Sequence, residues 1–128
     1  MKYLLDTHVL VWWLYGTTRL TARAHEAIAA PGNTIAVSAV SAFEIANKHR
    51  VGKWHEIASL ALGFEEIVTS QGFSVIPITA HHASRAGLLP GDHRDPFDRL
   101  LAAQAEIEEL RLLTSDPMFK AFRTQTIW

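Results

Sequence analysis

The sequence contains no cysteine. This absence excludes disulfide-linked folds, zinc sites with thiolate ligands and cysteine nucleophiles, and it is compatible with a reducing cytoplasm, where we expect the protein. An excess of positive charge is also lacking, because 12 Lys and Arg stand against 13 Asp and Glu for a formal net charge of −1. A protein that coats nucleic acid through its overall charge is therefore excluded, and any contact with nucleic acid must be local.

Long hydrophobic runs are absent as well. Asp6 and His8 interrupt the apolar start of the chain, which argues against a signal peptide. No run approaches the ~18 to 20 apolar residues of a membrane-spanning helix, so we expect a soluble protein without membrane association. The 128 residues are 48% hydrophobic and carry no internal repeat or low-complexity tract, which predicts one domain over residues 1–128.

Short apolar runs alternate with helical patterns along the chain. Strands are expected at residues 2–6, 34–38, 73–78, 111–115 and 124–127, and Pro77 indicates a strand end or an edge strand. Helices are expected at residues 8–15, 21–30, through Glu44, at 57–70, at 79–88 and from Asp95-Pro96 to about 110. This alternation predicts an α/β sandwich around a mainly parallel sheet.

Acidic residues stand where predicted strands end and predicted helices begin. Asp6 closes the first strand and Asp116 follows the strand at 111–115. The carboxyl ends of parallel strands share one sheet edge, where ligands bind in open α/β sheets, so these carboxylates are expected to be neighbours. Glu44 lies on a helix that leaves this edge, and Asp95 and Asp98 share the first turn of another helix.

Clustered carboxylates need a counter-charge, because otherwise some of their pKa values must rise. Oxygen ligands without cysteine or a well-placed histidine pair favour Mg²⁺ or Mn²⁺ over zinc. Such ions activate a water and stabilise the charge of a phosphoryl displacement, so the pattern predicts nuclease or phosphatase chemistry.

Each acid also has a structural interpretation. Turns or helix caps explain three of them, Asp6, Asp95 and Asp116, and the positive end of a helix also favours Asp98 in its first turn. Ser41 and Glu44 match a capping box, and Glu44 can pair with Lys48 at i,i+4. What favours a site is that all these acids fall at one predicted edge of one sheet.

Other polar and aromatic side chains carry weaker signals. Ordinary surface positions are expected for five histidines, His25, His49, His55, His81 and His82, whereas His8 and His93 lie near the acids. Arg94 and Arg99 are either solvated or grip phosphates beside the acids. Trp12, Trp13 and Tyr15 make the first helix so apolar that one side is expected to face the core and another a partner chain.

Four blocks of the sequence together resemble the PIN-domain ribonucleases, and within them the VapC-type toxins of bacterial toxin-antitoxin pairs. The blocks are residues 4–7, residues 37–45 with Lys48 and Gly52-Lys53, residues 93–105 and residues 113–116. The resemblance covers nearly the whole chain. It implies a PIN-like three-layer sandwich with a mainly parallel central sheet flanked by helices, metal-dependent RNA cleavage, a cognate antitoxin partner and a homodimer.

The resemblance also implies roles for individual residues. Matched by position, the catalytic metal ligands for Mg²⁺ or Mn²⁺ are Asp6, Glu44, Asp98 and Asp116. Thr7 and Ser115 match small hydroxyl positions near the metal in some members. Asp95 is an additional acid that many family sequences lack here, and its role as ligand or cap stays open.

We therefore expect a Mg²⁺- or Mn²⁺-dependent endoribonuclease that is the toxin of a toxin-antitoxin pair. One alternative is a non-catalytic PIN-like module that binds protein. Another is an Mg²⁺-dependent aspartyl-phosphate enzyme, against which the local sequence argues, because such a phosphatase needs an acid where His8 stands. The RNA target, the number of metal ions and the antitoxin family are not encoded in these patterns.

Overall fold

The structure, a computed structural model, describes the backbone of residues 1–128 and the side chains of residues 1–54 and 56–128. Its centre is a five-stranded sheet with the order β3-β2-β1-β4-β5, and every pairing is parallel. The strands are β1 (Lys2–Leu5), β2 (Thr34–Ser38), β3 (Ser74–Ile76), β4 (Arg111–Leu113) and β5 (Thr126–Ile127). The predicted α/β fold with a parallel sheet is confirmed.

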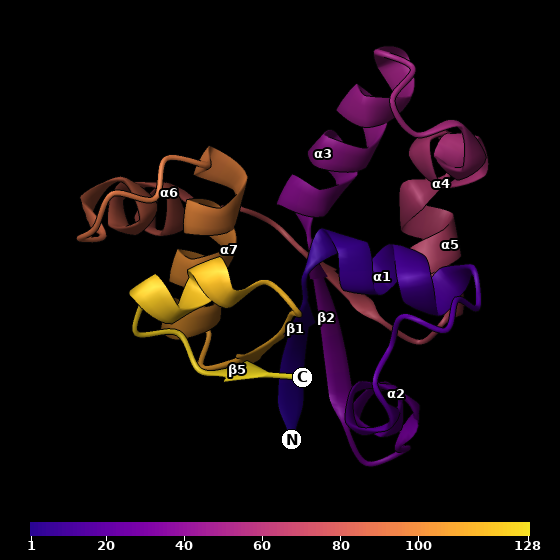
Figure 1. Cartoon of the computed structure of the whole chain (residues 1–128), viewed down its shortest axis with the longest axis horizontal. Helices are drawn as coiled ribbons and strands as arrows, with labels where there is room; N and C mark the ends of the chain where they lie inside the picture. The colour runs from indigo at the N-terminus through magenta and orange to yellow at the C-terminus, as the bar shows by residue number, and fades with distance from the viewer.

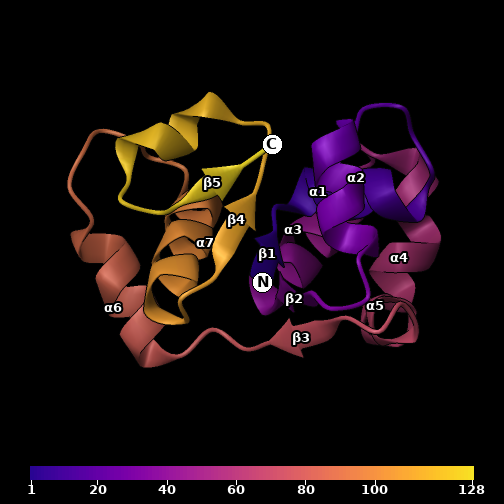
Figure 2. The same cartoon turned by 90° about the horizontal axis from the view of Figure 1, so that it is seen from below.

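Helices cover both faces of this sheet (Figures 1 and 2). One face carries α1 (Thr7–Leu14), α2 (Ala22–Ala29), the 3₁₀ turn η1 (His55–Ile57), α4 (Ala58–Leu62) and α5 (Phe64–Ser70). The other carries α6 (Ala80–Leu88), α7 (Pro96–Ile107) and the 3₁₀ turn η2 (Pro117–Ala121). Helix α3 (Ala39–Arg50) rises from the end of β2. No helix is long and apolar enough to cross a bilayer within the described residues.

The two faces of the sheet bury separate hydrophobic clusters. Leu5, Val37 and Leu113 pack with α1, α2, α4 and α5, whereas Leu4 and Leu112 pack with α6 and α7. Successive side chains of a strand point to opposite faces, so strands buried on both sides become continuous apolar runs. This arrangement is the three-layer sandwich that the sequence predicted.

The strands expected over 2–6, 73–78, 111–115 and 124–127 are shorter in the structure, and the helix expected over 57–70 is divided. The helix expected over 57–70 is broken at Gly63, whose φ of −134° and ψ of 38° are not helical, so α4 and α5 are separate. The Gly63 N–H still bonds the Ser59 carbonyl, and the Gly63 carbonyl accepts from Ile67, so the break leaves these groups paired. The third strand ends before Pro77 and lies at the sheet edge, as proline there indicated.

His82 is buried, so the expected surface position is wrong. Its Nδ1 accepts from the Thr79 N–H at 3.0 Å, and the Thr79 Oγ1 accepts from the His82 N–H at 3.2 Å. Because Nδ1 is an acceptor, Nε2 carries the proton and donates to Glu108 Oε1 at 2.8 Å. The imidazole therefore caps α6 and joins it to the end of α7. The expectation for His55 concerns a side chain outside the described residues.

Candidate active site

The parallel register of β1, β2 and β4 brings their carboxyl ends to one edge of the sheet. Leu5 pairs with Val37 on one side and with Leu113 on the other. The chain then continues into Asp6, whose N–H donates to the Leu113 carbonyl at 3.0 Å. Helix α3 leaves the same edge. In Figure 1, α3 and α7 lie on opposite sides of the end of β1.

Asp6 occupies the N-cap position of α1, but its side chain makes no capping hydrogen bond. One carboxylate oxygen, Oδ2, instead accepts a 2.7 Å hydrogen bond from Thr114 Oγ1, and only 7% of the residue is exposed. Burial raises the pKa of Asp6, and the negative charge of Glu44 raises it further, while the bond from Thr114 opposes the rise. A helix cap does not explain this side chain.

Glu44 lies on α3 and is mostly buried. Its Oε2 forms an ion pair with Lys48 Nζ at 3.2 Å, as the i,i+4 spacing predicted. The capping box with Ser41 is wrong, because Ser38 caps α3 by accepting from the Val40 N–H at 3.1 Å. The Ser41 hydroxyl instead shares a buried 2.8 Å hydrogen bond with Thr7 Oγ1, which ties the start of α1 to α3.

Asp98 lies in the first turn of α7. Its Oδ2 accepts a 2.8 Å hydrogen bond from His93 Nε2. Burial raises the pKa of Asp98 to about 6, and the charges of Asp95 and Asp6 add to the rise, whereas the bond from His93 lowers it. Asp95 itself is exposed and caps α7, accepting from the Phe97 N–H at 2.9 Å and the Asp98 N–H at 3.4 Å. The cap interpretation therefore describes the Asp95 side chain.

Asp116 lies two residues beyond Thr114 and caps η2 by accepting from the Met118 N–H at 2.9 Å. Its own N–H donates to Thr114 Oγ1 at 3.1 Å. Within residues 1–54 and 56–128, no three His, Asp or Glu side chains are gathered tightly enough to hold a metal ion in this conformation. The site is thus a set of neighbouring carboxylates, in which Asp6 interacts electrostatically with Glu44 and Asp98, and not a closed coordination sphere.

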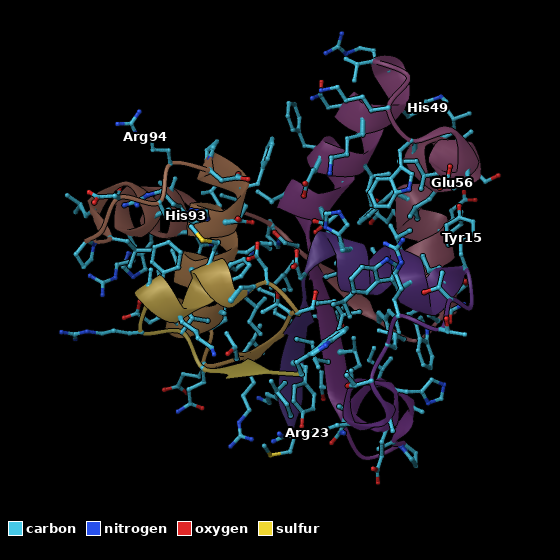
Figure 3. The ribbon with its side chains drawn as sticks, viewed as in Figure 1. Tyr15, Arg23, His49, Glu56, His93 and Arg94 are labelled. Atoms are coloured by element: carbon cyan, nitrogen blue, oxygen red, sulfur yellow. The ribbon has the colours of Figure 1, made fainter. Side chains whose placement is uncertain are left out.

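The guanidinium of Arg99 is not available to bind a phosphate, because its N–H groups donate to three backbone carbonyls. Its Nε donates to the Ala86 carbonyl and its Nη1 to the His93 carbonyl, each at 2.9 Å, and Nη2 donates to the Leu89 carbonyl. These bonds hold the segment that presents His93 to Asp98. Arg94 instead points away from the molecule (Figure 3).

Thr114 is the site residue that sequence reasoning missed. Ser115 is exposed, and the hydroxyl that reaches Asp6 comes from Thr114, which is buried. The register of the sheet contained the signal, because Leu5 pairs with Leu113 and the next residues of the two strands are Asp6 and Thr114. A threonine within an apolar run is otherwise typical of strand interiors.

Comparisons with known proteins identify the family. A sequence model of the PIN domain matches residues 3–124. The chain is also 33% identical over 132 residues to Ribonuclease VapC22 of Mycobacterium tuberculosis, with 98% of this chain and 97% of that protein covered. The chain belongs to the PIN-domain family, among its VapC-type members.

Solved structures show the same PIN fold. The crystal structure of VapBC2 from Rickettsia felis, bound to a DNA fragment from their promoter, contains a chain that matches with a TM-score of 0.73 and 23% identity over 99% of this chain and 98% of that one. The crystal structure of Mycobacterium tuberculosis VapC20, a sarcin-ricin loop cleaving toxin, matches with a TM-score of 0.63 and 16% identity over 93% of each chain. The resemblance drawn from the four sequence blocks is thereby confirmed.

Two aromatic rings next to the acids of this PIN domain contact each other. Phe43 precedes Glu44 on α3, Phe97 precedes Asp98 on α7, and their ring centroids lie 5.6 Å apart. Phe43 is 60% exposed, so the pair is open to solvent on one side. The contact connects the two helices that carry the acids.

Proposed function

We propose that this PIN domain is a metal-dependent endoribonuclease and the toxin of a toxin-antitoxin pair. The observation that supports the proposal most directly is that the charge of Asp6 interacts with the charges of Glu44 and of Asp98, two carboxylates from separate parts of the chain. Two of the three, Asp6 and Asp98, have raised pKa values, and titratable groups with such shifts are typical of functional sites. Ribonuclease activity agrees with the name of the VapC22 relative, and the toxin role agrees with that of VapC20.

A divalent cation suits this donor set. The candidate ligands are all carboxylates, and hard oxygen ligands favour Mg²⁺ or Mn²⁺. The electrostatic cost that raises the pKa values of Asp6 and Asp98 would be relieved by a bound cation. The residues that would hold the ion are Asp6, Glu44 and Asp98, with Asp116 as the fourth candidate. When bound, the ion would supply a water of lowered pKa and stabilise charge on the phosphate.

The chain's own residues orient these carboxylates. Thr114 donates to Asp6 and His93 donates to Asp98, so each carboxylate keeps one oxygen fixed. Both bonds favour the charged form that a metal ligand needs. Lys48 partly neutralises Glu44. In-line attack by water is expected to leave 5′-phosphate and 3′-hydroxyl ends on the RNA.

The test is RNA cleavage by the purified chain with Mg²⁺ or Mn²⁺ and with EDTA. We expect cleavage with either ion, none with EDTA, and loss of cleavage in Asp6→Asn with unchanged folding. Glu26→Gln is the matched control, because Glu26 is exposed on α2, away from the acids. Cleavage by Asp6→Asn equal to that of the unsubstituted chain, in nuclease-free preparations, would refute the assignment. A chain that neither cleaves RNA nor binds Mn²⁺ would instead be the non-catalytic binding module.

The toxin role is tested in cells. Induction of the chain is expected to stop growth, and co-expression of a small open reading frame beside its gene is expected to restore it. Induction of Asp6→Asn is expected to leave growth unaffected. The proposed partners are that antitoxin, an RNA substrate and a second copy of the chain, and the mass of the purified complex measures the last.

A further inference from the structure

A groove of about 610 Å³ lies along α1 on the side facing η1. None of the candidate metal ligands lines it, and its walls are rich in aromatic rings and cations. Figure 3 shows Tyr15 and Glu56 on this flank of the molecule. Its lining includes aromatic and basic side chains, namely His8, Trp12, Arg19, Lys48, Lys53 and Trp54. We call this feature the aromatic groove.

The rings of the aromatic groove form a connected row. The His8 ring centroid lies 5.3 Å from that of Trp54 and 5.9 Å from that of Trp12. Beside the groove, the centroid of Trp128 lies 5.8 Å from that of Trp12. The three indoles pack partly against the hydrophobic core, which fixes them, and His8 is exposed between two of them. The row thus offers rigid, partly open ring surfaces of the size of a nucleobase.

Cations accompany these rings. Lys48 Nζ lies 5.1 Å from the centroid of Trp54, and the Arg19 guanidinium lies 5.7 Å from that of Trp12. Lys53 is exposed, and within the described residues neither Arg19 nor Lys53 forms an ion pair with a carboxylate. Glu56 is the one acid that lines the groove in the described part of the chain. The groove is therefore locally positive in a chain whose net charge is −1.

The aromatic groove adjoins the carboxylate site through Lys48 and His8. Lys48 pairs with Glu44 of the site and also contacts Trp54 of the groove. His8 lies two residues after Asp6, on the first turn of α1. A polymer bound along the groove would therefore pass beside Asp6 and Glu44.

We infer that the aromatic groove binds the single-stranded RNA that flanks the cleaved bond, with bases stacked on Trp54 and Trp12 and phosphates held by Arg19 and Lys53. Positive grooves lined with aromatic rings bind single strands in this way, largely independently of sequence. The charge pattern favours a polyanion over an apolar protein helix. The inference rests on the proposed function and extends it to how the substrate is held.

The test compares two strands and two substitutions. The probes are fluorescent octamers, one of uridylate and one of the abasic ribose-phosphate, titrated in the Asp6→Asn background so that the strand is not consumed. Trp54→Leu is expected to weaken binding of the uridylate strand about 5-fold to 150-fold, the range for loss of one stacked base. Binding of the abasic strand is expected to stay unchanged, because it has no base to stack.

Matched controls separate stacking from charge. Trp13→Leu removes an indole of the same helix that contacts Gln71 and Phe73 instead of lining the aromatic groove, and it is expected to leave both affinities unchanged. Lys53→Gln is expected to weaken both strands equally and to reduce the slope of log Kd against log salt by about 0.7. A crosslinking experiment avoids any dependence on the folding of the groove variants, because the Asp6→Asn chain keeps every groove residue. Irradiation of this chain with 5-bromouridine RNA is expected to crosslink the RNA to Trp54 or Trp12.

The outcomes distinguish this inference from the proposed function. If the unsubstituted chain cleaves RNA but Trp54→Leu binds the uridylate strand as before and no crosslink maps to the groove, the inference is wrong. If Trp54→Leu keeps RNA binding and loses only the antitoxin, the groove is a protein-docking surface and the inference is again overturned. If the chain cleaves no RNA under any condition, the proposed function fails, whatever the binding data show.

Discussion

Replacing Asp98 with asparagine is expected to stabilise the metal-free protein at neutral pH. The folded state raises the pKa of Asp98 from its ordinary value of 3.8 to about 6, chiefly through burial. A carboxyl group whose pKa is higher in the folded state stabilises the fold at low pH. This stabilisation is complete below the unfolded-state pKa of about 4 and is lost as the pH rises through the folded-state pKa of about 6. At pH 7.5 the ionised Asp98 therefore opposes folding.

The size of the effect follows from the shift. About two pKa units at 1.36 kcal/mol each set a ceiling of about 3 kcal/mol. Asp98 is only partly buried, so solvent screening reduces the expected gain of Asp98→Asn to about 1–2 kcal/mol at pH 7.5. At pH 4.5 Asp98 is largely protonated in the folded state but mostly ionised in the unfolded state, so about a third of the difference is expected to remain, and it disappears only below about pH 4.

Urea unfolding in EDTA at both pH values measures this difference, with Glu26→Gln as the control for a change of net charge. Asp6 also has a raised pKa, so part of the pH dependence is expected to remain in Asp98→Asn. Saturating Mn²⁺ should reverse the order at pH 7.5, because the ion stabilises only the chain whose ligands are intact. An Asp98→Asn protein that is less stable than the unsubstituted chain in EDTA at pH 7.5 would refute the electrostatic reasoning.

Three further substitutions test the supporting contacts. Thr114→Val removes the donor to buried Asp6 and is expected to lower the free energy of unfolding in urea by about 1–3 kcal/mol and to slow RNA cleavage. Thr114→Ser keeps the donor and is expected to retain the stability and the cleavage rate of the unsubstituted chain. Equal cleavage rates in all three proteins would contradict this role. Arg99→Gln is expected to speed hydrogen exchange of the segment at 89–93, and unchanged protection would show that Arg99 does not hold it. His82→Leu is expected to cost about 1–3 kcal/mol of stability at unchanged cleavage, and lost cleavage in a folded protein would link His82 to the site.

Most of the fold could be predicted from the sequence because its signals are local and agree with one another. The strand at Thr34–Ser38 and the helices beginning after Thr79 and Asp95 are marked by β-branched runs and by caps. The break at Gly63 was missed because apolar spacing continues across it, and a glycine within a helical pattern leaves both outcomes open.

The candidate site was predictable only in part. The sheet topology that brings Asp6 beside Thr114 is a long-range property, but alternation with helices made a parallel sheet the expected solution. Side-chain direction was not predictable, since an exposed surface and a buried capping role are equally compatible with His82 on an amphipathic helix. The role of Arg99 was not predictable for the same reason, because its three carbonyl partners depend on how the end of α6 and the loop after it fold back onto α7.

The central claim is that Asp6, Glu44 and Asp98 bind one divalent cation between them. Anomalous diffraction from crystals of the chain grown with Mn²⁺ tests this claim most directly. We expect a manganese peak bonded to carboxylate oxygens of these residues, at the carboxyl ends of β1 and β4. Manganese bound elsewhere, with the three side chains still apart at saturating metal, would contradict the claim and the hydrolytic function built on it.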